Sequence, residues 1–78
     1  MGEEWRTQLA SDVVRNGVGI ELVNVVDRVV AEVFRCDADR SVTITVFERL
    51  PLIVMEQFLK TARSQLGEFE DGTPLPHS

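Results

Sequence analysis

Hydrophobic and polar residues alternate with a period of two along three stretches of the chain, residues 18–23, 28–35 and 41–47. Alternation in segments rich in β-branched residues is typical of β-strands that bury one face. We therefore expect an antiparallel meander of strands. The residues predicted to point to its buried face are Val18, Ile20, Leu22, Val29, Ala31, Val33, Val42, Ile44 and Val46.

The pairing of these strands is predicted from the charged residues, which should stay off the buried face. Val33 opposite Val42 meets this condition and leaves a short acidic loop between the two strands. A shift by one residue would turn the strand over and bury Glu32, at a large cost in desolvation. By the same argument, Leu22 lies opposite Val29.

Residues 51–66 have the spacing of an amphipathic helix. Pro51 is favoured in its first turn because the missing N–H of proline would be unpaired there. Gly67 supplies the backbone freedom that commonly ends a helix. The apolar residues predicted to face the sheet are Leu52, Met55, Phe58, Leu59, Ala62 and Leu66.

The length of 78 residues is that of one small domain. We assign residues 1–67 to a single α+β domain and residues 68–78 to a C-terminal tail, which contains two prolines and an Asp-Gly pair. Phe69 and Leu75 are the apolar side chains expected to hold this tail against the domain.

Residues 3–15 allow two interpretations. They form a helix if Trp5, Leu9 and Val13 share one stripe, or a strand if the Asn-Gly pair that follows makes a hairpin that sets Val13 opposite Ile20. We favour the hairpin. The expected fold is therefore a small antiparallel meander of three to four strands packed against one C-terminal helix. The alternative is the order α-β-β-β-α.

The net charge of −5, from 13 acidic and 8 basic residues, narrows the classes of partner that the protein is expected to bind. Binding to nucleic acid relies on clustered Lys and Arg, and the same cations attract anionic membranes. We therefore expect no nucleic acid and no membrane among the partners. An acidic surface fits a basic protein, and it also serves solubility alone.

The chain carries little of the chemistry that enzymes use. One histidine, His77, and one cysteine, Cys36, cannot complete a zinc site or a catalytic triad. Asp37, Asp39 and Glu48 have spacings found in calcium loops, but Val42 stands where such a loop needs glycine. We expect no enzyme activity, no cofactor and no metal.

Cysteine usage and segment composition predict a location. A single cysteine forms no internal disulfide, which is typical of a reducing compartment. The first residues do not have a basic region followed by an apolar run, and no apolar run approaches the ~20 residues of a membrane helix. We expect a soluble cytoplasmic protein.

Large apolar side chains remain on the sheet face opposite the predicted core. This reverse face can be covered by the N-terminal segment with Trp5 and Leu9, by a second copy of the chain, or by another protein. An open apolar patch commonly marks an interface. The residues predicted to form that interface are Val30, Glu32, Phe34, Phe47, Asp37 and Asp39.

Size, charge and the scarcity of chemistry together predict a small acidic, non-enzymatic protein-binding module. An inhibitor or immunity-type protein, which occupies the surface of a partner, is one example of this class. The alternative is a structural or accessory subunit that assembles with copies of itself as a homodimer. A carrier with a small-ligand pocket between helix and sheet is a third possibility.

Overall fold

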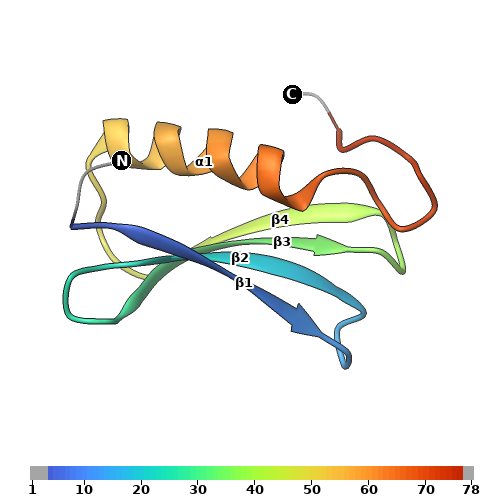
Figure 1. Cartoon of the computed structure of the whole chain (residues 1–78), viewed down its shortest axis with the longest axis horizontal. Coiled ribbons are helices and arrows are strands. Elements are labelled where there is room, and N and C mark those ends of the chain that lie inside the picture. The colour runs from blue at the N-terminus through green and yellow to red at the C-terminus, as the bar shows by residue number, and fades with distance from the viewer. Residues whose placement is uncertain (1–3, 77–78) are drawn as a thin grey trace.

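The computed structural model describes residues 4–76, so His77 lies outside the described residues. The strands pair in the order β1-β2-β3-β4 as one antiparallel sheet, and the helix α1 lies along one face of it (Figure 1). This confirms the predicted α+β meander with a C-terminal helix. Of the two interpretations of the N-terminal residues, the hairpin is correct and the helix is not. The elements are β1 (Arg6–Asp12), β2 (Gly17–Val23), β3 (Val29–Cys36), β4 (Ser41–Val46) and α1 (Leu52–Leu66).

The core lies between α1 and the two central strands, β2 and β3. Apolar residues at alternate positions of these strands point to the helix, as predicted from the period of two. Trp5 packs against the edge of this core. The buried residues of the core are Ile20, Leu22, Val30, Ala31, Val33, Val54, Phe58, Ala62, Leu66, Phe69 and Leu75.

The strand register differs from the prediction by two residues, although each strand presents the predicted face. Val33 lies opposite Ile44 rather than Val42, and Leu22 lies opposite Ala31 rather than Val29. A shift of two residues exposes the same faces, so charge placement does not distinguish the two registers. The turn geometry decides between them.

The turn between β3 and β4 is built by its own side chains. Arg40 takes a positive φ of 55°, and the Asp39 carboxylate accepts hydrogen bonds from the backbone N–H and the hydroxyl of Ser41. Aspartate commonly stabilises tight turns in this way. The first hairpin is also longer than predicted, and Leu9 rather than Val13 lies opposite Ile20.

A β-bulge between β2 and β3 explains one buried residue that alternation places on the reverse face. Leu22 lies opposite Ala31 and Val23 lies opposite Val29, so Val30 has no partner on β2. A bulge inserts one extra residue and redirects the side chains around it. Val30 is consequently buried in the core, next to Ala31 in the sequence.

The helix begins one residue later than predicted. Phe58, Ala62 and Leu66 face the sheet as predicted, and the difference lies in the first turn. The carbonyl of Pro51 accepts a hydrogen bond from the N–H of Met55, so the proline directly precedes the first turn. Val54 is buried, whereas Leu52 is exposed, contrary to the prediction. Four successive apolar residues at the helix start leave its rotation undetermined by sequence. The buried row is Val54, Phe58, Ala62 and Leu66.

The segment after α1 folds back onto the domain. Gly67 has a positive φ of 64° and ends the helix, as predicted. Phe69 and Leu75 are both buried in the core, which confirms that these two side chains hold the segment.

A pair of charged residues at the end of β3 fixes the same segment. The Arg35 guanidinium donates to the carbonyls of Leu66 and Glu68, and its Nε lies 3.2 Å from Asp37. Asp37 accepts a hydrogen bond from the N–H of Glu70. Arg35 and Asp37 therefore connect the sheet to the end of α1 and to the chain beyond it.

Candidate protein-contact surface

The reverse face of the sheet is closed over Phe34. The ring of Phe34 lies against β2 where two glycines leave room: a Cβ at Gly17 would be 2.7 Å from the ring, and a Cβ at Gly19 would be 3.3 Å from it. The guanidinium carbon of Arg15 lies 3.9 Å from the ring centroid on the outer side. Phe34 is only 5% exposed as a result.

Arg15 is held over the ring by two carboxylates. Its Nε donates to Asp12 at 2.5 Å, and Nη2 donates to Glu32 at 3.2 Å. Hydrogen bonds to Glu32 and Asp12 raise the pKa of Arg15. The backbone N–H and the side chain of Arg15 both lower the pKa of Asp12. The turn between β1 and β2 thus covers Phe34 on this face, a role that the prediction considered for the N-terminal segment.

The predicted interface on the reverse face is consequently not exposed as a patch. Val30 and Phe34 are buried, and Glu32 is paired with Arg15. Asp37 is occupied by contacts within the chain, as described above. Of the predicted residues, only Phe47 and Asp39 are largely exposed, and Asp39 is engaged in the turn after β3. The predicted open patch is absent for two reasons: the bulge turns Val30 into the core, and Arg15 covers Phe34.

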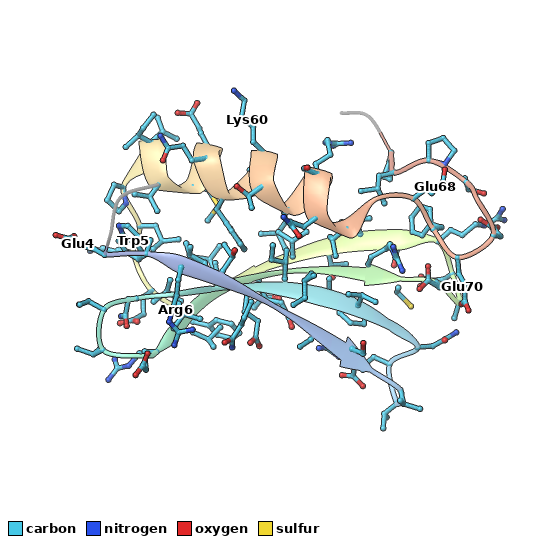
Figure 2. The ribbon with its side chains drawn as sticks, viewed as in Figure 1. Glu4, Trp5, Arg6, Lys60, Glu68 and Glu70 are labelled. Atoms are coloured by element: carbon cyan, nitrogen blue, oxygen red, sulfur yellow. The ribbon has the colours of Figure 1, made fainter. Side chains whose placement is uncertain are left out.

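Half of the exposed large apolar side chains of the described residues come from β4, from the residue after it and from the start of α1; the others are Leu9, Val13, Val14, Val25 and Val26. We call the first set the β4 surface. The central strands are mostly buried, whereas β4 is exposed over most of its length. The outer side of α1 is polar: Lys60 projects from it away from the sheet (Figure 2). The residues of the β4 surface are Ile44, Val46, Phe47, Leu52 and Ile53.

The backbone of β4 contributes unpaired groups to this surface. β4 is an edge strand, and the N–H of Phe47 bonds the carbonyl of Val30 on the β3 side. Backbone groups alternate in direction along an antiparallel strand. The N–H and C=O groups of Val42, Ile44 and Val46 therefore point outward, away from β3. Residues 41–47 contain no charge, proline or glycine, the features that commonly protect an edge.

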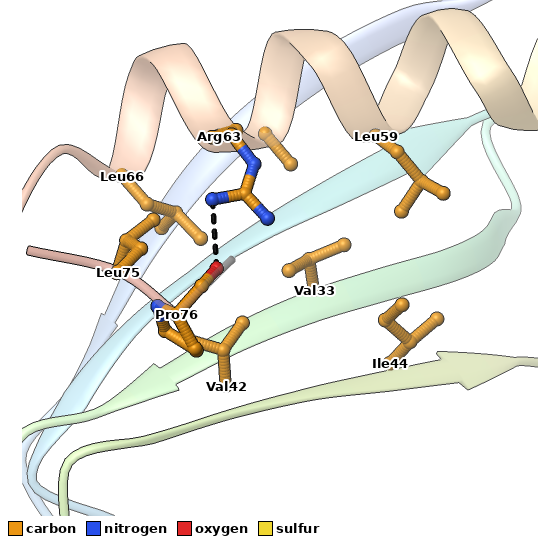
Figure 3. Close-up of a pocket in the computed structure, with 9 residues that line it drawn as sticks. Val33, Val42, Ile44, Leu59, Arg63, Leu66, Leu75 and Pro76 are labelled. Atoms are coloured by element: carbon orange, nitrogen blue, oxygen red, sulfur yellow. Dashed lines mark hydrogen bonds between the residues drawn. The ribbon is translucent and has the colours of Figure 1, made fainter. Parts of the chain in front are cut away.

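A cavity of about 350 Å³ opens beside the β4 surface. It lies between α1 and β3–β4, with Leu75 and Pro76 at one end and Ile44 at the other (Figure 3). Arg63 spans its rim and donates a hydrogen bond to the carbonyl of Pro76 at 2.9 Å. The other residues that line it are Val33, Val42, Leu59, Ala62 and Leu66.

The residues with calcium-loop spacing are engaged separately. Asp37 pairs with Arg35, and Glu48 lies 3.3 Å from Arg28. Within residues 4–76, no three His, Cys, Asp or Glu side chains are grouped as metal ligands. Over the same range, the chain has no helix with the length and apolar character required to cross a bilayer.

Comparisons of the chain with models of protein families, with curated proteins and with solved structures find no significant match. Its fold and surface define a small α+β domain with an open, uncharged edge strand. The uncharged run of β-branched residues from Val42 to Val46 is the sequence signal that indicates such an edge. Only the strand order identifies it as the last strand of the sheet rather than an inner one.

Proposed function

We propose that this chain is a small acidic protein-binding module that acts through the β4 surface and not by catalysis. The observation that carries the proposal is the combination, on one edge strand, of exposed apolar side chains with outward-pointing backbone groups. A protein that adds a strand to an open edge satisfies both at once. Isolated apolar residues need no partner, but several exposed apolar residues on an open edge strand favour an interface.

The titratable groups support a role without catalysis. The carboxylates whose pKa is lowered, Asp12, Asp39 and Asp71, each accept hydrogen bonds within their own turn. Turn-forming hydrogen bonds account for these shifts, so they need no catalytic explanation. Arg63 is the one charged residue that lines the described cavity. The proposal of a cytoplasmic location rests on the single cysteine, Cys36, whose thiol is free.

Site-specific photo-cross-linking tests the contact surface in the cells that make the protein. A benzophenone amino acid at Phe47 should give a discrete protein adduct, because this side chain lies on the β4 surface. The same probe at Gln57, which is exposed on α1, is the matched control and should give none. Absence of an adduct from Phe47, or equal adducts from both positions, would contradict the proposal.

The cavity favours a second candidate function, that of a carrier for a small carboxylic acid with an apolar chain. The lining is almost entirely apolar, and Arg63 places a guanidinium at its rim. A chain of methylene groups would gain about 0.8 kcal/mol for each one buried. Titration with decanoate and with decanol should show tighter binding of the acid, and Ala62→Leu should abolish binding by filling the cavity. Equal binding by the Ala62→Leu protein would exclude this site.

A further inference from the structure

We propose that the occupant of the β4 surface is a second copy of the chain, paired antiparallel through β4 to β4. The two four-stranded sheets then join into one sheet around a two-fold axis. This inference rests on the proposed function, since it names the partner of the same surface. An interface of this kind is closed, because each copy uses the same edge and exposes no further one on that side.

The backbone permits a symmetric register centred on Ile44. In this register, Ile44 lies opposite Ile44 of the second copy, and Val42 lies opposite Val46. These are the residues whose N–H and C=O groups point outward, so each opposed pair can exchange two hydrogen bonds. A two-fold axis that passes between the strands places the central residue of one copy opposite the same residue of the other. Directly opposed residues point to the same face of the sheet.

The side chains in this register are complementary on both faces. On the helix side, Val42, Ile44 and Val46 meet their counterparts, and this row of β-branched residues becomes continuous across the two copies. On the reverse side, Thr43 lies opposite Thr45. Pairs of β-branched residues and pairs of threonines stabilise neighbouring strands when they lie directly opposite.

The charges that flank β4 are also complementary. Just beyond the two ends of β4, this register places the turn residue Arg40 of one copy near Glu48 of the other, twice by symmetry. No charge lies between these positions, so no like charges face each other along the edge. Within the described residues, Glu48 pairs through Oε1 with Arg28 at 3.3 Å, its Oε2 is buried without a hydrogen-bond partner, and Arg40 has an exposed contact of 3.6 Å with Asp71.

The other edge strand, β1, is a weaker candidate for self-pairing. Leu9 is its only large apolar side chain, so β1 has no apolar row like that of β4. The charges at its two ends form shorter ion pairs within the chain, Arg6 with Asp27 and Asp12 with Arg15, each at 2.5 Å, than the pairs at 3.3 Å and 3.6 Å that flank β4. The two edges nevertheless offer a matched comparison, because Leu9 is 52% exposed and Ile44 is 53% exposed.

Sedimentation equilibrium of the full chain tests the dimer. The wild type should have twice the monomer mass of 8.8 kDa. Ile44→Lys should raise the dimer dissociation constant at least about 100-fold, because the two introduced lysines face each other and apolar burial is lost. Leu9→Lys should leave the dimer intact. Unchanged circular dichroism of both variants confirms that the fold is preserved.

Charge exchange provides an independent check of the register. Arg40→Glu and Glu48→Arg should each weaken the dimer about 5- to 30-fold, while an equimolar mixture of the two variants, or the double variant, should recover most of the affinity. A mixture that remains monomeric would reject the register centred on Ile44.

Three results would overturn the proposal in distinguishable ways. A wild type that stays monomeric up to millimolar concentration removes the dimer. If the probe at Phe47 then still gives an adduct with another protein, the proposed function stands without the dimer. If it gives no adduct, the proposed function and the dimer both fail. Disruption by Leu9→Lys alone would assign the contact to β1, and disruption by both lysine variants would indicate an open-ended β1-to-β4 contact.

Discussion

Arg15 closes the reverse face of the sheet because its side chain combines an apolar stem with a planar cation. The guanidinium stacks on Phe34 and pairs with Asp12 and Glu32 at the same time. Long cationic side chains commonly cover apolar surface while their charge stays hydrated. One residue in a turn therefore covers Phe34 without a second helix on this face.

At the same scale, the two glycines under Phe34 should differ in their tolerance of a side chain. A Cβ at Gly17 would lie 2.0 Å from the carbonyl oxygen of Arg35, whereas at Gly19 its nearest neighbour, at 3.0 Å, is a side-chain oxygen of Glu32. Backbone yields less than a side chain, so Gly17→Ala should cost about 1–3 kcal/mol of unfolding free energy and Gly19→Ala clearly less. Urea denaturation measures both. Equal losses would mean that the sheet relaxes around position 17.

The pH dependence of stability should also be traceable to single residues. The pKa of Asp12 is below its ordinary value of 3.8, because the backbone N–H and the side chain of Arg15 bond the carboxylate. A lowered folded-state pKa stabilises the fold above the unfolded pKa, and this contribution is lost as the pH falls through the folded value. Asp12→Asn should therefore reduce the loss of stability on acidification below about pH 4. Thermal melts from pH 6 to pH 2 measure this, and an unchanged pH profile would contradict it.

At the scale of the element, the rotation of α1 is decided by packing on β2 and β3. Val54 is buried and Leu52 is exposed, although both are large apolar residues in the first turn. Val54→Ala should cost about 2 kcal/mol of unfolding free energy. Leu52→Ala should stay within about 0.5 kcal/mol of the wild type. Chemical denaturation of the two variants under dimer-free conditions gives the comparison, and the reverse order would place the other side of the helix on the sheet.

At the scale of the whole molecule, the segment after α1 belongs to the core. Phe69 and Leu75 are buried against it, and Arg35 and Asp37 hold the intervening backbone. A chain ending at Gly67 should lose about 3–6 kcal/mol, because burial of each of these two side chains contributes about 1.5–3 kcal/mol. Such a loss approaches the total stability of a small domain. A cooperative melt of the shortened chain at the wild-type temperature would contradict this expectation.

The sequence alone determined the class of fold, the face that each strand presents, and the residues around which the helix begins and ends. These features follow from local periodicity, from Pro51 and Gly67, and from the cost of burying charge. Tertiary structure decided the register, the bulge at Val30, the rotation of α1 and the position of Arg15. A period of two does not change under a shift of two residues, and a helix that begins with four apolar residues has no single apolar side. Contacts between distant segments resolve both ambiguities, and they leave the edge of β4 open.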